Sequence, residues 1–361
     1  MKYIDEYRDR ELISLLIKRI RHEATGNYRF MEVCGGHTAA IRRFGIQSMI
    51  PENIALLSGP GCPVCVTGNL FIDKAITFSH FDDVIITTFG DLIRVPGSNS
   101  SLEKEKSKGY DIRIVFSGLD ALDIAKTESN KKIVFPGIGF ETTAPGTAAT
   151  IKEAFSNGLD NYYVLSSHKI MPPAIEEVIK DGAAIHGFIC PGHVAAITGS
   201  SIFDFISEKY HLSCVVSGFE PVDILQSILL LIRQVNTGCP GTEIEYSRAV
   251  TKEGNRKARM IIEEVFELCD EDWRGFGSIS SSGLKIRDKY GQHDAEKRIP
   301  INVKPASDND LCICNQILRG IKTPDNCALY KLKCSPESPV GACMVSEEGT
   351  CNIYFRYGSK N

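Results

Sequence analysis

The sequence predicts an α/β protein with two similar α/β domains, whose parallel sheets face a central cleft, followed by a C-terminal cysteine-rich region. Two observations point to this fold class. Short β-branched or aromatic runs alternate with helical segments through the first two thirds of the chain, which is the pattern of parallel strands covered by helices on both faces. The last fifty residues instead contain six of the thirteen cysteines and few apolar runs. That region is therefore expected to fold around a metal centre.

The individual elements follow from this alternation. Apolar residues at helical spacing predict a first helix at residues 5–22, which ends before Gly26. Strands are expected at residues 28–33, 53–57, 83–88 and 112–116, and in a second series at residues 132–135, 162–165, 186–189 and 213–216. Further helices are expected at residues 68–79, 119–127, 143–156, 172–180, 221–235 and 255–269. The two series of four strands predict a first domain at residues 1–130, a second at 131–254, and a helical, cluster-binding region at 255–361.

The composition restricts the class of protein. A net charge of -4 and a pI of about 6.1, without a basic run, exclude the electrostatic footprint of a nucleic-acid-binding protein. The first twenty residues are charged and amphipathic, unlike a signal peptide, and the longest apolar stretch, around residues 228–232, is too short to span a membrane. We expect a cytoplasmic protein without nucleic-acid or membrane partners, in which thirteen cysteines indicate metal or redox chemistry rather than structural disulfides.

Three thiols follow the first two expected strands. Cys62 and Cys65 form a Cys-x-x-Cys on a turn rich in glycine and proline, where they could close a disulfide, share a metal or act as a redox pair. Cys34 begins a helix in the motif Cys-Gly-Gly-His-Thr, and the helix N-terminus together with His37 is expected to favour its thiolate. Such a thiolate would be a nucleophile or a soft metal ligand, whereas the alternative is a cysteine packed beside a turn.

Other polar groups follow later strands. Glu141 would place a carboxylate at the cleft, and Thr142 or Thr143 could cap the next helix, but the Gly-x-Gly before them lacks the third glycine of a dinucleotide site. His193 could donate a hydrogen bond or move a proton. Glu220 and Asp223 could position His193 or cap a helix. Cys190, Cys214, Cys239 and Cys269 are expected to be buried or incidental thiols.

The C-terminal cysteines are separated by irregular gaps, which do not match the paired knuckles of most structural zinc sites. An iron-sulfur cluster held only by thiolates needs four of the six and is favoured over zinc. The spacing lacks the Cys-x3-Cys-x2-Cys triplet of a radical-SAM enzyme. The six residues are Cys312, Cys314, Cys327, Cys334, Cys343 and Cys351.

Taken together, these motifs resemble the hydrogenase-maturation family HypD along nearly the whole chain. The shared segments are Cys34-Gly-Gly-His-Thr, Gly59-Pro-Gly-Cys-Pro-Val-Cys-Val-Thr, Pro136-Gly-Ile-Gly-Phe-Glu-Thr-Thr, Pro191-Gly-His-Val, Gly218-Phe-Glu-Pro-Val-Asp and Gly341-Ala-Cys-Met-Val-Ser-Glu-Glu-Gly-Thr-Cys. The resemblance implies a scaffold that works with a small HypC-type partner and on which the Fe(CN)2CO unit of [NiFe]-hydrogenase is assembled. Cyanide would come from a HypE-type protein, and the finished unit would pass to the hydrogenase large-subunit precursor.

The resemblance also implies roles for the thiols. Cys34 would be an iron ligand shared with a cysteine of the partner, and Cys62 and Cys65 a redox pair that exchanges electrons with a [4Fe-4S] cluster. Cys312 is the less expected sixth thiol, and the five candidates for the four cluster ligands are Cys314, Cys327, Cys334, Cys343 and Cys351. This describes an assembly scaffold rather than a turnover enzyme. The alternatives are an iron-sulfur-dependent thiol-disulfide reductase and a purely structural iron or zinc protein.

Overall fold

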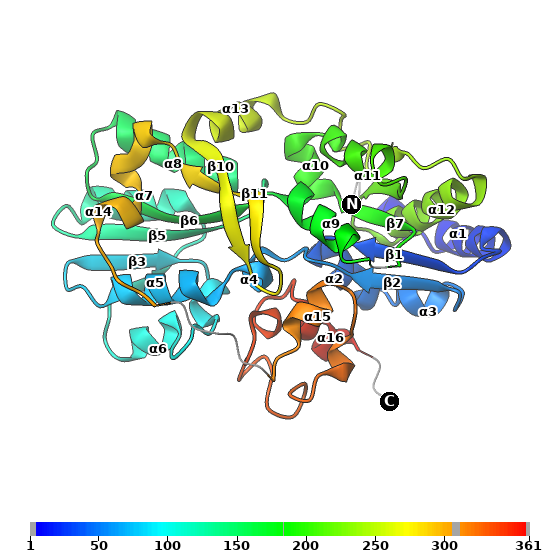
Figure 1. Ribbon diagram of the computed structural model, residues 1–361, viewed down its shortest axis with the longest axis horizontal. Helices are drawn as coiled ribbons and strands as arrows, with labels where there is room; N and C mark the ends of the chain where they lie inside the picture. The colour runs from blue at the N-terminus through cyan, green and yellow to red at the C-terminus, as the bar shows by residue number, and fades with distance from the viewer. Residues whose placement is uncertain (1–4, 183, 305–310, 359–361) are drawn as a thin grey trace.

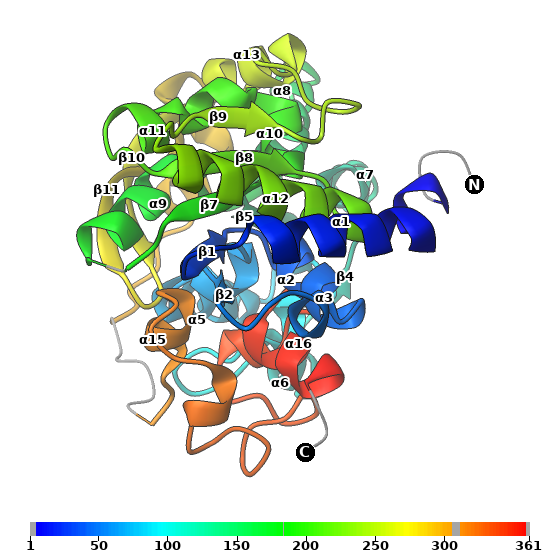
Figure 2. The same ribbon diagram turned by 90° about the vertical axis from the view of Figure 1, so that its right-hand side faces the viewer.

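The computed structural model describes residues 5–182, 184–304 and 311–358. It contains two sheets that lie side by side, as Figure 1 shows, and confirms the predicted α/β class. We call the part formed by the sheets and their helices, up to residue 304, the body, and residues 311–358 the tail. In both views the tail lies on one side of the two sheets (Figures 1 and 2).

The first sheet is wholly parallel, in the order β2-β1-β7-β8-β9. Its strands are β1 (Tyr28–Glu32), β2 (Ile54–Ser58), β7 (Gly187–Pro191), β8 (Ser213–Ser217) and β9 (Thr242–Ile244). The second sheet has the order β10-β11-β6-β5-β3-β4, and β11 pairs antiparallel with both β10 and β6. Its strands are β3 (Val84–Thr88), β4 (Ile112–Ile114), β5 (Lys132–Gly139), β6 (Tyr162–Lys169), β10 (Phe266–Trp273) and β11 (Gly277–Ile286).

The predicted grouping of the strands is wrong. β5 and β6 join β3 in the second sheet, whereas β7 and β8 return to pair with β1 in the first. The change-over predicted near Lys131 therefore falls between β4 and β5 of one sheet. Each buried parallel strand carries the same kind of apolar run, so the local pattern does not record which strands pair.

Helices cover the sheets. The body helices are α1 (Arg10–Glu23), α2 (Gly35–Arg43), α3 (Ile46–Met49), α4 (Pro63–Val66), α5 (Asn69–Ser79), α6 (Leu102–Ser107), α7 (Gly118–Thr127), α8 (Ala144–Ser156), α9 (Met171–Lys180), α10 (Gly192–Thr198), α11 (Asp204–Glu208), α12 (Pro221–Thr237), α13 (Arg256–Val265) and α14 (Ala295–Arg298). Short 3-10 turns are η1 (Asp5–Arg8), η2 (Leu92–Arg94), η3 (Ser200–Phe203) and η4 (Asp288–His293). The tail contains α15 (Cys314–Leu318), η5 (Pro324–Asn326), η6 (Ala342–Met344) and α16 (Thr350–Tyr357). No helix among the described residues is both long and apolar enough to cross a membrane.

Three apolar cores hold the body together. One packs α1 and α12 on the first sheet, and another packs α7, α8 and α13 on the second. The third, which we call the central core, includes residues of both sheets, such as Phe188 and Val134, together with Trp273 from β10 and Leu318 from the tail. Because the central core contains residues of both sheets and of the tail, it fixes the ends of the sheets relative to the tail.

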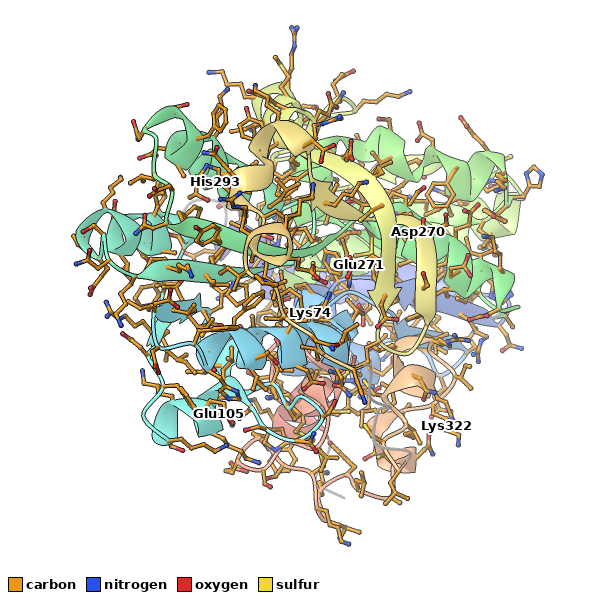
Figure 3. All side chains as sticks on the ribbon, turned by 60° about the vertical axis from the view of Figure 1, so that its left-hand side comes forward. Lys74, Glu105, Asp270, Glu271, His293 and Lys322 are labelled. Atoms are coloured by element: carbon orange, nitrogen blue, oxygen red, sulfur yellow. A yellow bond between two sulfur atoms is a disulfide. The ribbon has the colours of Figure 1, made fainter. Side chains whose placement is uncertain are left out.

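The β10–β11 hairpin replaces the last part of the helix expected at residues 255–269, which ends at Val265. The hairpin is the long element on which Figure 3 labels Asp270 and Glu271. Glu271 accepts a hydrogen bond from the buried Lys169 Nζ at 3.0 Å, and the hairpin tip reaches the turn after Cys65, where the Arg274 N–H donates to the Val66 carbonyl at 2.8 Å. The hairpin thus ties the second sheet to the thiol turn.

Candidate functional site

Cys34 stands where β1 leads into α2. It is the residue before the first turn of the helix, in an extended conformation, and its N–H donates to Glu32 Oε2 at 3.2 Å. The same buried carboxyl accepts a hydrogen bond from the Thr38 hydroxyl, and burial raises the pKa of Glu32 to about 8. Sequence reasoning missed Glu32, although a glutamate at the end of an otherwise apolar strand was a signal that it could have used.

The expected thiolate at Cys34 is contradicted by its surroundings. Burial, with the negative charges of Glu348 and Glu32 nearby, raises the pKa of the Cys34 thiol to about 12. His37 contributes no positive charge, because burial lowers its pKa to about 4 and its Nε2 donates to the Ser217 and Gly218 carbonyls at 3.3 and 3.0 Å. Cys34 is therefore a neutral thiol.

An aromatic stack joins three strand ends of the first sheet. Phe219, after β8, stacks between His37 and His193, with ring centroids 4.5 and 3.9 Å apart. A Cβ on Gly36 would lie 3.1 Å from the Phe219 ring, so the ring sits directly against the Cys34 loop. Cys34, His37 and His193 are thus brought together, with Phe219 as the residue that the sequence reasoning did not single out. The sequence allowed Glu220 and Asp223 either to position His193 or to cap a helix. The structure shows that both cap α12.

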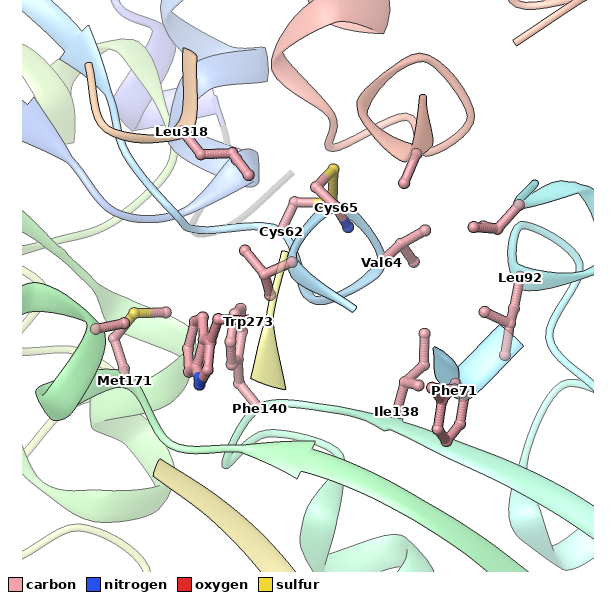
Figure 4. Close-up of a cluster of buried hydrophobic side chains, with 14 of the residues drawn as sticks. Cys62, Val64, Cys65, Phe71, Leu92, Ile138, Phe140, Met171, Trp273 and Leu318 are labelled. Atoms are coloured by element: carbon pink, nitrogen blue, oxygen red, sulfur yellow. A yellow bond between two sulfur atoms is a disulfide. The ribbon is translucent and has the colours of Figure 1, made fainter. Parts of the chain in front are cut away.

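Cys62 and Cys65 form a disulfide, with their Cα atoms 5.2 Å apart. Cys62 precedes α4 and Cys65 lies within it, and the exposed fractions of the two residues are 3% and 0%. Figure 4 shows the disulfide among buried side chains of the central core, including Trp273, Phe140 and Leu318. Of the three states that the sequence allowed, the structure shows the disulfide.

The two thiol loops touch through their backbones. The Gly35 N–H donates to the Gly61 carbonyl at 3.1 Å, and a Cβ on Gly61 would lie only 2.2 Å from the Cys34 nitrogen. Only glycine fits at this close approach. The end of β1 and the turn after β2 therefore hold Cys34 beside the turn that carries Cys62.

Glu141 makes its hydrogen bond with α9 and none with these thiols among the described residues. Its Oε1 accepts the Met171 N–H at the start of α9 at 2.9 Å, its Oε2 has no hydrogen-bond partner among the described residues, and burial raises its pKa to about 7. Thr142 is exposed. Thr143 precedes α8, but its side chain makes no capping hydrogen bond, so the predicted cap is wrong. The Glu141 carboxylate therefore accepts a hydrogen bond at the start of α9. Thr142 makes no hydrogen bond to Cys34, His37 or His193 in the part of the chain that the structure describes.

The six tail cysteines line one cavity, and two of them are members of the central core, against which Cys312 and Cys351 also pack. The sulfurs of Cys314 and Cys343 are 2.8 Å apart, and both residues belong to the central core with the Cys62–Cys65 disulfide. A smaller apolar cluster, formed by Leu329, Tyr330, Met344 and Tyr354, contains or contacts the other four thiols. These are Cys312, Cys327, Cys334 and Cys351.

The tail packs against both thiol loops. A Cβ on Gly35 would lie 2.4 Å from the Glu348 carbonyl oxygen, and η6, which contains Cys343, contacts α4. The Arg42 guanidinium lies 3.9 Å from the centroid of the Tyr354 ring and donates to its hydroxyl, so α2 and α16 are joined. The tail thiols therefore lie next to the turns that carry Cys34 and the disulfide.

Comparison with known proteins identifies the family of the chain. The sequence model of HypD, described as the hydrogenase formation hypA family, matches residues 11–358. The chain belongs to the HypD family. It is 44% identical to hydrogenase maturation factor HypD2 of Bradyrhizobium diazoefficiens and to HypD of Cupriavidus necator, in each case over 99% of this chain and 97% of the relative. It is 41% identical to HypD of Azotobacter vinelandii, over 99% of this chain and 97% of the relative.

The tail of this HypD family member is chemically compatible with an iron-sulfur cluster. Among the described residues, no three His, Cys, Asp or Glu side chains are arranged around a single metal ion. A cluster makes a different demand, because each thiolate binds a different iron and the ligand sulfurs do not touch one another. Four separate thiols around one enclosed cavity provide the donor type that such a group requires.

Proposed function

We propose that this HypD family protein is a scaffold on which the Fe(CN)2CO unit of [NiFe]-hydrogenase is assembled, with the iron held at Cys34. Membership of the family makes the chain a hydrogenase maturation factor. The observation that carries the finer role is the convergence of Cys34, the buried disulfide and the His37–Phe219–His193 stack at the strand ends of one sheet. No other described cysteine combines partial exposure with such a position.

The surroundings of Cys34 suit transfer of an iron unit. Thiolate is a ligand that low-spin iron with cyanide and CO accepts well. Because burial keeps the free thiol protonated, iron binding must release that proton, and losing the iron returns it. The unit would therefore be held only while its iron compensates the thiolate charge. Phe219 covers one side of the loop, and the hydrogen bond to Glu32 fixes its backbone.

The tail would hold a [4Fe-4S] cluster through Cys312, Cys327, Cys334 and Cys351. This changes the predicted ligand set: of the described tail thiols, Cys312, Cys327, Cys334 and Cys351 border the small apolar cluster of the tail, whereas Cys314 and Cys343 belong to the central core, so Cys312 takes a place among the four. A bound cluster supplies electrons one at a time. Cys314 and Cys343 form a second thiol pair beside α4. Reduction of the Cys62–Cys65 disulfide takes two electrons and two protons and yields two thiols, which would support reductive ligand chemistry at the neighbouring Cys34.

The partners follow from the same role. A small HypC-type protein would supply the second cysteine ligand to the iron, a HypE-type protein would deliver cyanide, and the hydrogenase large-subunit precursor would receive the unit, all in the cytoplasm. The alternative of a thiol-disulfide reductase acting on protein disulfides fits less well. Cys62 and Cys65 are almost fully buried, which prevents a protein disulfide from reaching either sulfur.

Infrared spectra of the complex with the HypC-type partner test the role of Cys34. In Cys34→Ala we expect the bands of bound cyanide and CO to be lost. Cys239→Ala provides the control, because Cys239 is an exposed cysteine in the turn after α12 and its variant should keep the bands. Bands of full intensity in Cys34→Ala would rule out the proposed iron ligand.

The electron-handling role of the disulfide is tested separately. Cys62→Ser and Cys65→Ser should each abolish the formation of active hydrogenase in cells, whereas Cys269→Ser, a partly exposed cysteine on β10, should not. Normal hydrogenase activity with either disulfide variant would remove the pair from the mechanism.

A further inference from the structure

Lys169 is a buried residue to which the function proposed above gives no role. It is the last residue of β6, and its exposed fraction is 1%. Its Nζ donates to the Ser167 hydroxyl at 3.1 Å, to Glu271 Oε1 at 3.0 Å and to the Asp272 carbonyl at 2.8 Å. Lysine is seldom buried, and a buried ion pair adds little net stability. A role in positioning a part of the chain is the better explanation for this one.

The contact of Lys169 with Glu271 joins two strands that are not neighbours. β11 lies between β6 and β10, and its Gly283 pairs with Lys169 on one side and with Cys269 on the other. A Cβ on Gly283 would lie 2.6 Å from the Glu271 Cβ, so glycine leaves the room that Glu271 needs to reach over β11. The register shift between Cys269 and Glu271 is typical of a β-bulge, which redirects a side chain. The edge strand β10 is thereby fastened to β6.

The fastened end of β10 reaches the disulfide turn. Trp273 forms a backbone bridge with Thr67, and the next N–H of the chain donates to the Val66 carbonyl at 2.8 Å. Val66 and Thr67 directly follow Cys65. Trp273 is fully buried and belongs to the apolar side chains that Figure 4 shows with the disulfide. Residues 271–274, which we call the hairpin end, therefore cover the disulfide turn on one side.

We propose that Lys169 is a positioning residue for the Cys62–Cys65 pair: it fixes the hairpin end over the disulfide and thereby keeps low-molecular-weight thiols away from it. The inference rests on the redox function proposed above for this pair. It adds a control of the electron source, because a disulfide that is shielded from small thiols takes its electrons only from groups within the protein or its complexes.

The shielding can be measured as a rate. The Cys62–Cys65 disulfide is almost fully buried, so a small reagent reaches it only when its cover opens. The rate of reduction then follows the fraction of molecules in which the cover is open. Removal of the Lys169 amino group takes three hydrogen bonds from the closed form. Loss of one hydrogen bond to a charged group is enough to raise the open fraction about tenfold.

Dithiothreitol is the probe for the test, since it is neutral and carries two thiols. It loses two electrons and two protons and closes to a cyclic disulfide, and the protein pair gains them as two thiols. Full-length protein is oxidised with diamide and freed of the reagent. The appearance of the Cys62 and Cys65 thiols is then followed by acid quenching, alkylation and mass spectrometry. In Lys169→Met we expect reduction about tenfold faster than in the unaltered protein.

Three further variants separate the fastening from other effects of the substitution. Glu271→Ala removes an acceptor of Lys169 and should also speed reduction about tenfold, whereas Glu271→Gln keeps an acceptor oxygen and should keep most of the protection. Lys285→Met is the charge control. Lys285 is ion-paired with Glu267 at 3.0 Å near the open end of the same hairpin, and both side chains are exposed. Its loss should leave the rate unchanged.

Alkylation of Cys190 with iodoacetamide, without dithiothreitol, distinguishes opening of the hairpin from general unfolding. Cys190 is a fully buried thiol on β7, and its alkylation should be equally slow in every variant. If Lys169→Met does not fold, Glu271→Ala decides, because the Glu271 side chain is 21% exposed. An unchanged rate of reduction in the deciding variant, an equal loss of protection in Glu271→Gln, or an equal acceleration at Cys190 would each overturn the inference.

The measurement needs neither the HypC-type partner nor active hydrogenase. A negative result therefore leaves the redox function of the Cys62–Cys65 pair standing. Normal hydrogenase activity with Cys62→Ser would instead remove that function without changing the measured rates of reduction.

Discussion

The body and the tail of this protein are stabilised in different ways. The body has two sheets whose inner parallel strands are almost entirely buried, and three apolar cores pack helices on them. The tail has only short helices and one small cluster, while Leu311, Ile321 and Leu332 in it are more than half exposed. The body contains enough apolar surface to fold by itself, whereas the tail depends on its thiols and on contacts with the body.

The body and the tail therefore contribute to the candidate site in different ways. The strand ends of the body hold Cys34 and the disulfide in fixed positions, and the tail adds the remaining thiols to a frame that already exists. With the proposed cluster in the tail, such a site would have one rigid half and one half that forms together with the cluster. Experiments that affect one half and spare the other test the distinction.

The largest expected effect is on the tail. Cys334→Ser should lose most of the bound iron and acid-labile sulfide, because it removes one of the four thiols that we propose as ligands of the iron-sulfur cluster. Without the metal the tail should open, and limited proteolysis should cleave it about tenfold faster while the body stays intact. Iron and sulfide analysis of anaerobically purified protein, together with mapping of the cleavage sites, makes the measurement.

Cys314→Ser is the matched control for that experiment. Cys314 belongs to the touching pair, so its variant should keep the iron and sulfide content of the unaltered protein. Loss of iron from Cys314→Ser, with full retention in Cys334→Ser, would show that the four-and-two division of the tail thiols is incorrect.

A buried carboxyl should limit the stability of the body at high pH. Burial raises the pKa of Glu141 from 4.5 to about 7, so its contribution is fully present below pH 4.5 and is lost as the pH rises through 7. The loss amounts to about 3 kcal/mol, since one pKa unit corresponds to 1.36 kcal/mol. Glu141→Gln keeps an acceptor for the Met171 N–H and stays neutral, so at pH 9 it should be more stable than the unaltered protein by about this amount.

Unfolding of the body by denaturant is measured through the fluorescence of Trp273. This residue is the single tryptophan and lies buried in the central core. At pH 4 the two proteins should have similar free energies of unfolding, and the difference should grow from about pH 4.5 to about pH 7 and then stay constant up to pH 9. Glu208→Gln, at an exposed site on α11, should show no such pH dependence. A constant difference from pH 5 to pH 9 for Glu141→Gln would contradict the assignment.

The contact between the thiol loops should have a smaller effect. Gly61→Ala places a Cβ 2.2 Å from the Cys34 nitrogen, so the backbones must separate, and we expect a loss of about 2 kcal/mol in the free energy of unfolding. Gly146→Ala is the control, because Gly146 lies in α8 with no atom within 4 Å of the added Cβ. That variant should be neutral or more stable by about 0.5–1 kcal/mol. Equal effects of the two substitutions would show that the loops do not need their close approach.

The elements of the body could be predicted because their signals are local. Runs such as residues 28–32 and 54–58 are apolar and end in turn residues, and the structure places β1 and β2 there. The same runs also predicted that Cys34 and the Cys62–Cys65 turn follow parallel strands. Pairing is not a local property, since β7 lies beside β1 although more than 150 residues separate them in sequence.

What could not be predicted depends on distant parts of the chain. The pKa of Cys34 was expected to fall because of the helix N-terminus, yet burial and Glu348 from the tail raise it. Residues 266–269 at the start of β10 are predicted as helix because β10 is an edge strand whose exposed positions alternate with buried ones and carry acidic residues. The burial of Cys314 and Cys343 in the central core depends on contacts between the tail and the body, and the spacing of the cysteines in the sequence does not encode that.

The smallest expected effect concerns the seam between body and tail. Arg42 lies on α2, the helix that begins after Cys34, and is 3.9 Å from the centroid of the Tyr354 ring on α16. The pair therefore links the loop that carries Cys34 to the tail. In a double-mutant cycle with Arg42→Met and Tyr354→Leu, we expect a coupling of about 1 kcal/mol in the opening of α16, measured by hydrogen exchange. The cycle with Arg43→Met gives the control, because Arg43 is exposed and lies over Phe44 instead. A coupling that is absent for Arg42, or equally large for Arg43, would mean that the tail is held by its metal and the central core alone.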